Sequence, residues 1–149
     1  LAREVGLMAD IVARCCRLKA GVVARDERET SGYRAILNFG HTVGHGLERT
    51  AGYGNYLHGE AVAIGMVAAM RVSAGLGVCS AADVDRLERL LVSFGLPIEL
   101  PDGLDRAELS QAIGLDKKAR SDKIVFIVAS GIGGCDIRPI APAEIVEGF

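Results

Sequence analysis

The apolar residues follow a helical period over most of the chain, and this pattern is the strongest constraint on its fold. They recur every three or four positions in 1–24, 33–51, 59–77 and 80–94, with glycine-containing turns between these segments. Acidic residues at Asp105 and Glu108 indicate the start of a further short helix that reaches Ile113. We therefore expect a mostly α fold.

The pattern changes near the C-terminus. Residues 123–128 (KIVFIV) form a β-branched and aromatic run, 135–138 form a second one, and three glycines lie between them. Short runs of this kind around glycines predict a small β-hairpin. A proline at position 142 suits the first turn of a last short helix. We predict a single helical domain over 1–149 that carries this hairpin.

The composition excludes several classes of protein. The 149 residues have a formal net charge of −2 and are half hydrophobic, which argues against intrinsic disorder and against a nucleic-acid-binding surface. The longest apolar run, 61–70, is too short to span a bilayer, and the first residues do not resemble a signal peptide. We expect a cytoplasmic protein without a membrane segment. Because the chain starts at Leu1 within a helical pattern, we expect it to be part of a longer protein.

The four cysteines show no metal-binding spacing. Cys15 and Cys16 are adjacent, and Cys79 and Cys135 stand alone in the sequence. The chain is not small and cysteine-dense like a secreted disulfide scaffold. We expect four reduced thiols, most of them buried.

One predicted helix carries an unusual polar stripe. The residues of the stripe are spaced four, three, four and three positions apart, as on one face of a helix: Arg34, Asn38, His41, His45 and Glu48. The stripe is either the solvated face of an amphipathic helix or a binding site. Solvated faces are usually rich in Glu, Lys and Gln, whereas Arg, Asn and His recognise anions and metals, which favours a site. Many glycines surround the stripe, which indicates that something approaches the backbone closely.

All three histidines lie within 41–58. His41 and His45 are one helical turn apart, and His58 follows a glycine-rich turn that reverses the chain. Three imidazoles with an open position would suit Zn²⁺ or Co²⁺. An H-x-x-x-H spacing also occurs by chance, so the pattern alone is moderately specific.

The chain resembles the C-terminal domain of the 3-dehydroquinate synthase family along nearly its whole length. The strongest matches are L-N-F-G-H-T-V-G-H within 34–45 and L-H-G-E-A-V within 53–66, with further agreement at L-K-A-G-V-V-A-R-D-E-R-E (18–29), G-L-P (95–97) and D-K-K (116–118). The segment from Glu29 to Arg34 is one residue longer than the family's usual E-x-G-x-R.

The resemblance implies a two-domain phosphate lyase of aromatic amino acid (chorismate) biosynthesis. Such an enzyme converts 3-deoxy-arabino-heptulosonate 7-phosphate to 3-dehydroquinate and phosphate, the second step of the shikimate pathway. It uses transient oxidation by NAD, metal-assisted β-elimination and intramolecular aldol closure. The resemblance also implies an N-terminal NAD-binding domain outside this chain, a small sugar acid phosphate as substrate, and a homodimer. We expect this chain alone to be inactive.

The resemblance also implies roles for individual residues. The divalent metal, Zn²⁺ or Co²⁺, is held by His41, by His58 and by a glutamate upstream of this chain. His45, near the substrate phosphate, is a candidate for proton transfer or phosphate contact, and Glu29 and Asn38 are further candidate catalytic residues. The positions that contact the substrate carboxylate and ring hydroxyls are Lys19, Glu29, Arg34 and Asn38. Either Lys117 or Lys118 holds the phosphate.

Other functions compete with this interpretation. Another sugar-phosphate cyclase would differ at the carboxylate-binding positions, where Arg34 and Lys19 favour an acid substrate. A metal-dependent polyol dehydrogenase would not need the anion-binding bases. As an isolated chain, the protein could also be a non-catalytic helical fragment that dimerises or docks. Turnover by the isolated chain would contradict the expected need for a cofactor domain.

Overall fold

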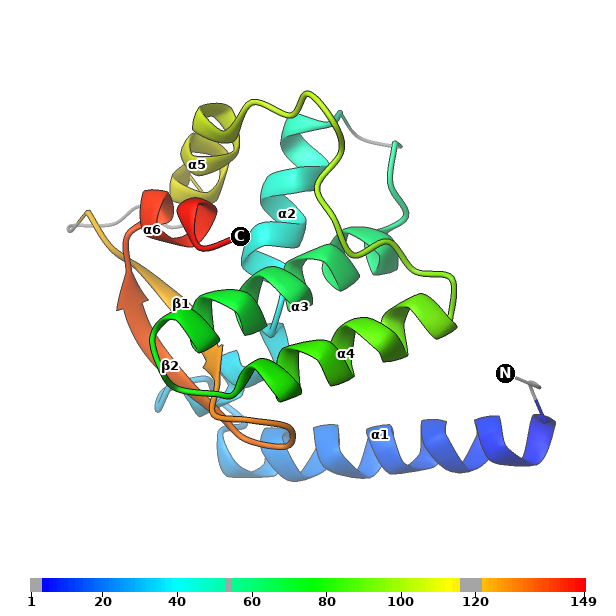
Figure 1. Ribbon diagram of the computed structural model, residues 1–149. Helices are drawn as coiled ribbons and strands as arrows, with labels where there is room; N and C mark the ends of the chain where they lie inside the picture. Colours follow the sequence, from blue (N-terminus) through cyan, green and yellow to red (C-terminus); the bar gives the residue numbers. More distant parts are fainter. Residues whose placement is uncertain (1–3, 53–54, 116–121) are drawn as a thin grey trace. The chain divides into compact units, whose positions relative to one another are not determined.

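The computed structural model describes residues 4–52, 55–115 and 122–149. The chain forms two compact units, Leu1–Leu37 and Asn38–Phe149, which are described separately below. The assignment of 1–149 to one domain stays a prediction. Figure 1 shows the helices and the hairpin along the chain.

The first unit consists of one long helix and a turn. Helix α1 (Val5–Arg25) confirms the predicted first helix, and the 3₁₀ helix η1 (Tyr33–Asn38) follows the turn. No residue of α1 is buried, so its apolar face is not part of a core in this structure. The exposed members include Val5, Leu7, Met8, Ile11, Val12 and Leu18.

The second unit is built around one central helix. Figure 1 shows α3 (His58–Gly75) beside α2 (His41–Thr50) and α4 (Ala81–Ser93), and α3 also contacts α6 (Pro142–Glu147). Helix α5 (Arg106–Leu115) packs against α2 and α6. The small side chains of α3 are buried, among them Ala61, Ala63, Ala68 and Ala69. The helix predicted over the Ala- and Gly-rich segment 59–77 is confirmed, and its small side chains let neighbouring elements pack closely against it.

A two-stranded antiparallel sheet covers one side of α3. Strand β1 (Ile124–Ala129) pairs with β2 (Cys135–Ile140), from Ile124 opposite Ile140 to Ala129 opposite Cys135. Phe126 and Val128 of β1 are buried in the core. The predicted hairpin and final helix are therefore confirmed.

Local capping sets the ends of α4 and α5 as predicted. The Ser80 hydroxyl accepts a hydrogen bond from the Asp83 amide, and Asp83 Oδ2 accepts one from the Ser80 amide at 3.2 Å. After α4, Gly95 has a φ of 74°, the left-handed conformation that ends many helices. Asp105 Oδ1 accepts a hydrogen bond of 2.8 Å from the Ala107 amide at the start of α5.

The prediction of one continuous helix over 33–51 is wrong. A 3₁₀ helix ends at Asn38, and α2 begins at His41 after Gly40, whose φ is 81°. A Cβ at Gly40 would lie 2.7 Å from the Met66 amide nitrogen, so α3 also requires glycine there. The five-residue stripe is therefore not one helical face. Only its last three members share α2.

The prediction that most cysteines are buried is also wrong. All four are free thiols, but Cys15, Cys16 and Cys135 are exposed and Cys79 is half-buried. The two adjacent cysteines lie on α1, which buries no side chain. Among the described helices, none combines the length and the apolar character needed to cross a bilayer.

Candidate metal and substrate site

Three imidazoles gather where α2 and α3 begin. His41 and His45 lie one turn apart on α2, and His58 is the first residue of α3. The ring centroids are 5.5 Å apart for His41 and His45, 5.3 Å for His41 and His58, and 5.8 Å for His45 and His58. The histidine cluster predicted from the sequence therefore forms within the second unit.

Glycines allow the backbones of α2 and α3 to approach at this place. A Cβ at Gly44 would lie 3.1 Å from the Ala61 carbonyl oxygen, and a Cβ at Gly65 would overlap the Gly40 carbonyl. Gly46 faces the Ile113 side chain of α5 instead. The expected close approach to the glycine backbone is therefore made by neighbouring helices.

His41 and His58 each have an oxygen next to Nδ1. Nδ1 of His41 lies 3.3 Å from the Phe39 carbonyl oxygen, and Nδ1 of His58 lies 3.1 Å from Glu48 Oε1. A carbonyl or carboxylate oxygen only accepts, so in each pair the neutral imidazole donates from Nδ1 and keeps its lone pair on Nε2. The Glu48 side chain is 20% exposed and that of His58 is 57% exposed.

This arrangement fits a divalent metal. Two imidazoles bound to one tetrahedral Zn²⁺ at Zn–N distances of about 2.0–2.1 Å have ring centres about 5 Å apart. The separations of the three rings are close to this value. Among the described residues, the group whose ligand atoms all lie within 4.8 Å of one another is His45, Glu48 and His58, and it does not include His41. Glu48 belongs to the polar stripe predicted from the sequence but had no predicted role there, although its position three residues after His45 puts both on one helical face.

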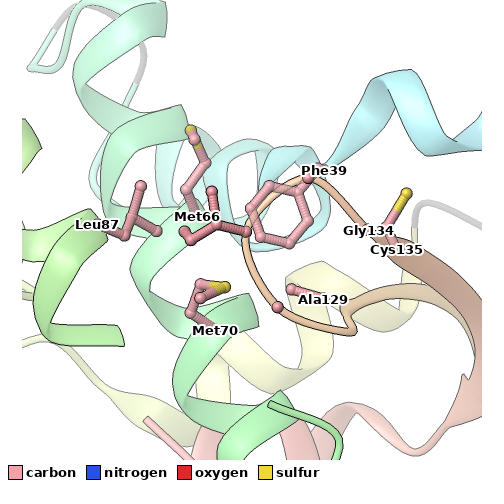
Figure 2. Close-up of a pocket in the computed structure, with 10 residues that line it drawn as sticks. Phe39, Met66, Met70, Leu87, Ala129, Gly134 and Cys135 are labelled. Atoms are coloured by element: carbon pink, nitrogen blue, oxygen red, sulfur yellow. The ribbon is translucent and has the colours of Figure 1, made fainter. Parts of the chain in front are cut away.

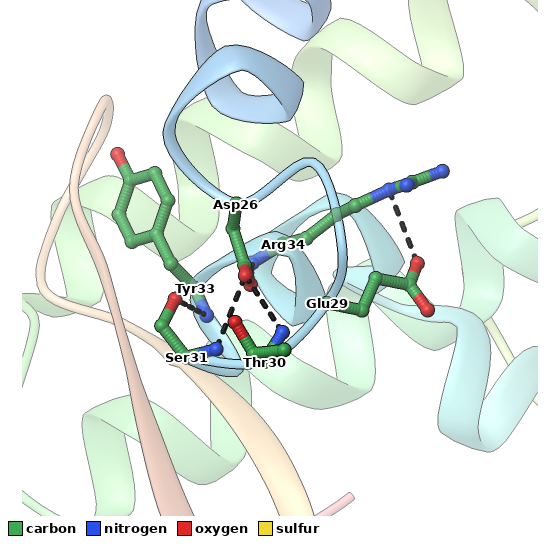
Figure 3. A network of polar contacts seen from close by, with 6 residues as sticks. All are labelled: Asp26, Glu29, Thr30, Ser31, Tyr33 and Arg34. Carbon is green, nitrogen blue, oxygen red and sulfur yellow. Dashed lines mark hydrogen bonds and ion pairs between the residues drawn. The ribbon is translucent and has the colours of Figure 1, made fainter.

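The first unit contains a polar network that organises the turn after α1, as Figure 3 shows. The buried Asp26 carboxylate accepts hydrogen bonds from the amides of Thr30 at 2.9 Å, Ser31 at 3.1 Å and Arg34 at 3.1 Å. The bond from the Ser31 amide is the largest cause that lowers the pKa of Asp26, against the opposing effect of burial. Asp26 thus fixes the backbone on which two predicted substrate residues lie.

Those two residues form an ion pair. Arg34 Nε lies 3.1 Å from Glu29 Oε1 (Figure 3). Glu29 has a φ of 53°, so the longer turn between them includes one left-handed residue that is not glycine. Lys19 is exposed on α1, in the same unit.

The remaining predicted residues are placed as follows. Asn38 is exposed at the end of η1 and opens the second unit. Lys117 and Lys118 lie outside the described residues. The structure therefore brings His41, His45 and His58 together in one unit, and Glu29 and Arg34 together in the other.

An apolar pocket of about 270 Å³ also lies in the second unit. Figure 2 shows Phe39, Met66, Met70 and Leu87 around it, with Cys135 at the start of β2. The described residues that line it include no histidine and no charged side chain. The pocket lacks the bases that an anionic sugar phosphate requires, so the histidine cluster is the better candidate site.

Comparison with known proteins gives the same family as the motifs. The family model described as 3-dehydroquinate synthase C-terminal matches residues 1–119. The 3-dehydroquinate synthase of Pelobacter propionicus is 53% identical over 146 residues, which cover 98% of this chain and 40% of that protein. That of a Synechococcus species is 46% identical over 141 residues, 95% of this chain and 38% of that protein.

Solved structures of related folds support the architecture. A 2-deoxy-scyllo-inosose synthase complexed with carbaglucose-6-phosphate, NAD⁺ and Co²⁺ is 26% identical, with a TM-score of 0.67 over 76% of this chain and 34% of that chain. A 2-epi-5-epi-valiolone synthase from Streptomyces hygroscopicus, with NAD⁺ and Zn²⁺ bound, is 20% identical, with a TM-score of 0.80 over 96% of this chain and 39% of that chain. Because the valiolone synthase is only 20% identical, its similarity supports the fold alone.

The chain spans about 40% of the length of the Pelobacter relative. The family model nevertheless matches most of the chain. The matched residues include both histidine motifs of the chain, the one within 34–45 and the one within 53–66. The chain belongs to the 3-dehydroquinate synthase C-terminal family.

Proposed function

We propose that this chain is the metal- and substrate-binding part of a 3-dehydroquinate synthase. The whole protein would convert 3-deoxy-arabino-heptulosonate 7-phosphate to 3-dehydroquinate and phosphate. The observation that carries this proposal is the histidine cluster, in which His41 and His58 both direct Nδ1 to an oxygen and keep Nε2 for a ligand. The named relatives and the specific histidine motifs support the substrate.

His41 and His58 would hold Zn²⁺ or Co²⁺ through Nε2, together with a glutamate from a part of the enzyme that precedes this chain. When bound, the metal polarises a substrate oxygen and NAD supplies the hydride chemistry. His45, one turn along α2 from His41, would move a proton or contact the phosphate. This division of roles leaves His45 outside the set of ligands.

The charged groups of the first unit would recognise the substrate's carboxylate end. The Arg34 guanidinium presents a planar fork that matches a carboxylate, and Glu29 holds it at 3.1 Å. Lys19 and Asn38 would contact the carboxylate and hydroxyls, and Lys117 or Lys118 the phosphate. A substrate with both an acid and a phosphate would use all of these groups, which is why we favour it over a neutral hexose phosphate.

Cobalt titration of this chain tests the metal assignment. We expect Co²⁺ binding to be weak in the isolated chain, to be lost in His41→Ala and His58→Ala, and to persist in His45→Ala. Loss of binding in His45→Ala would instead indicate a self-contained three-histidine site and would contradict the role given to His45.

Activity assays test the reaction. We propose that turnover needs the part of the relatives that this chain does not span, and that the complete enzyme is a cytoplasmic homodimer. The complete enzyme should release phosphate from the heptulosonate phosphate and not from a hexose phosphate. An equal rate with the hexose phosphate would favour another sugar-phosphate cyclase.

A further inference from the structure

We propose that Glu48 is a positioning residue of the metal site. Its carboxylate accepts a hydrogen bond from Nδ1 of His58 and so keeps the Nε2 lone pair of this imidazole available to a divalent cation. This inference rests on the proposed function, because it assumes that His58 is a metal ligand. It gives a role to a residue that the sequence motifs left unassigned.

The geometry at His58 carries the first step. Glu48 reaches from α2 and His58 from the start of α3, and Glu48 Oε1 lies 3.1 Å from Nδ1. An ionised carboxylate has no proton to donate, so the hydrogen of this contact must be on Nδ1 of the imidazole. The contact therefore selects one of the two neutral tautomers. Because the His58 side chain is 57% exposed, the packing around it restrains the ring little, and this contact matters more for its orientation.

His41 provides an independent parallel. Its Nδ1 lies 3.3 Å from the Phe39 carbonyl oxygen, which also only accepts. The two proposed ligands thus have the same ring nitrogen occupied, one by a backbone oxygen and one by a carboxylate. Metal-binding histidines typically donate their second N–H to an acceptor of this kind, which fixes the ring and raises its basicity.

A second glutamate near His58 has a different task. Glu60 Oε2 accepts a hydrogen bond of 2.9 Å from the Leu57 amide and so caps the first turn of α3. It also suits the positive end of the helix dipole. Glu60 is therefore a matched control for Glu48. It lies in the first turn of α3, two residues after His58, and bonds to the Leu57 amide, whereas Glu48 lies on α2 and bonds to the imidazole.

Glu48 could alternatively be a ligand itself, since its oxygen and nitrogens of His45 and His58 lie within 4.8 Å of one another. The two roles differ in one respect that can be measured. As a positioning residue, Glu48 binds the hydrogen of Nδ1 and the metal binds Nε2. As a ligand, Glu48 would be bound to the metal and its removal would change the coordination sphere.

The tautomer of His58 can be measured without metal. Long-range ¹H–¹⁵N correlation spectra of the histidine-labelled chain distinguish Nδ1–H from Nε2–H, with His58→Ala used to assign the signals. We expect Nδ1–H in the wild type and in Glu60→Gln, in which the amide oxygen can still cap α3. Glu48→Ala should shift His58 toward Nε2–H, and Glu48→Gln should shift it less because its amide oxygen still accepts. A wild-type His58 in the Nε2–H form would overturn the proposal.

Cobalt binding supplies the second measurement. We expect Glu48→Ala to weaken Co²⁺ binding by about 10- to 100-fold and Glu48→Gln by less, as is typical for partners that orient a ligand. The visible absorption bands of bound Co²⁺ should keep their positions, since the ligands are unchanged. Loss of binding in Glu48→Gln, which keeps an acceptor for Nδ1–H, or displaced bands in that variant would show that Glu48 is a ligand and would overturn the positioning role.

The two proposals fail in different ways. If His41→Ala and His58→Ala leave Co²⁺ binding unchanged, the proposed metal site is wrong, whatever the tautomer of His58. If those variants lose binding while Glu48→Ala changes neither the tautomer nor the affinity, the metal site stands and the role of Glu48 is wrong.

Discussion

Gly65 of α3 packs directly against the backbone of Gly40, the residue that precedes α2. A Cβ at Gly65 would overlap the Gly40 carbonyl oxygen and would lie 2.9 Å from the Gly44 amide nitrogen. Because His41 follows Gly40, this contact fixes where the first histidine of the cluster begins its helix.

We expect Gly65→Ala to destabilise the protein by about 3 kcal/mol or more, since a methyl group placed against rigid backbone forces the two helices apart. It should also weaken Co²⁺ binding, because His41 would move away from His58. Chemical denaturation and the cobalt titration measure the two effects. Gly75→Ala is the control: it lies in the same helix, and a Cβ there meets no described atom within 4 Å. Equal stability of the two variants would contradict this role of Gly65.

The sequence predicted the helices better than it predicted their contacts. The caps at Ser80 and Asp105 are local signals, because the interacting groups lie within three residues of one another. The break at Gly40 is not local, because glycine is required there by the backbone of Met66, which lies on α3, 26 positions further along the chain. Sequence periodicity carries no information about such an approach, so 33–51 was predicted as one helix.

In the candidate site, too, the sequence predicted which residues take part but not the contacts between helices. The motifs identified His41, His45 and His58, and the structure brings these three together. Glu48 was visible in the polar stripe, but its contact with His58 depends on how α2 meets α3 and could not be read from spacing. The prediction that Cys15 and Cys16 are buried failed for a different reason. It relied on the general tendency of cysteine to be buried, which does not apply on a helix without a packed face.

Ser73 connects α3 to the end of β1 inside the core. Its buried hydroxyl donates to the Ala69 carbonyl and accepts a hydrogen bond of 2.9 Å from the Ala129 amide. Ser73→Ala leaves this buried amide without its partner, so we expect a loss of about 1–3 kcal/mol of unfolding free energy. Ser93→Ala is the control, because that hydroxyl is exposed and donates to the Leu90 carbonyl within its own helix. A smaller loss for Ser73→Ala than for Ser93→Ala would contradict the structural role.

The Asp26 network should make the turn after α1 sensitive to acid. Hydrogen bonds, that of the Ser31 amide first, lower the pKa of Asp26 below its ordinary value of 3.8. A carboxyl with a lowered pKa stabilises the fold fully above its ordinary value, and this contribution is lost as the pH falls through the lower folded-state value. The Thr30 and Ser31 amides should therefore keep their chemical shifts and their protection from hydrogen exchange until the pH is below 3.8.

Asp26→Asn tests this explanation. Its amide oxygen can accept only part of the three hydrogen bonds, and its charge is absent at every pH. We expect faster exchange at Thr30 and Ser31 near neutral pH and no acid transition at these amides. An acid transition in Asp26→Asn equal to that of the wild type would assign the pH dependence to another group.

Arg71 joins three segments of the second unit. Its guanidinium donates to Glu88 Oε1 of α4 at 2.9 Å and to both oxygens of Glu99, at 2.7 and 3.1 Å. Its Cζ also lies 5.3 Å from the ring centroid of Phe149, the last residue. The hydrogen bond from Arg71 is the main cause that lowers the pKa of Glu99 below its ordinary value of 4.5.

We expect Arg71→Met to cost about 1–2 kcal/mol of unfolding free energy, because the site is partly exposed and water competes for the charges. The loss should be smaller in high salt, which screens exposed charges. It should also diminish as the pH falls through the lowered pKa of Glu99, since a protonated Glu99 no longer attracts the guanidinium. Arg89→Met, a change at an exposed arginine of α4, is the control.

Arg71→Lys separates the charge from the geometry. An ammonium group keeps the positive charge but cannot bind both Glu99 oxygens in a planar fork while it also reaches Glu88. We expect it to recover less than half of the stability lost in Arg71→Met, as measured by chemical denaturation at neutral pH. If the lysine variant is as stable as the wild type, the three segments are joined by charge alone and the fork geometry contributes nothing.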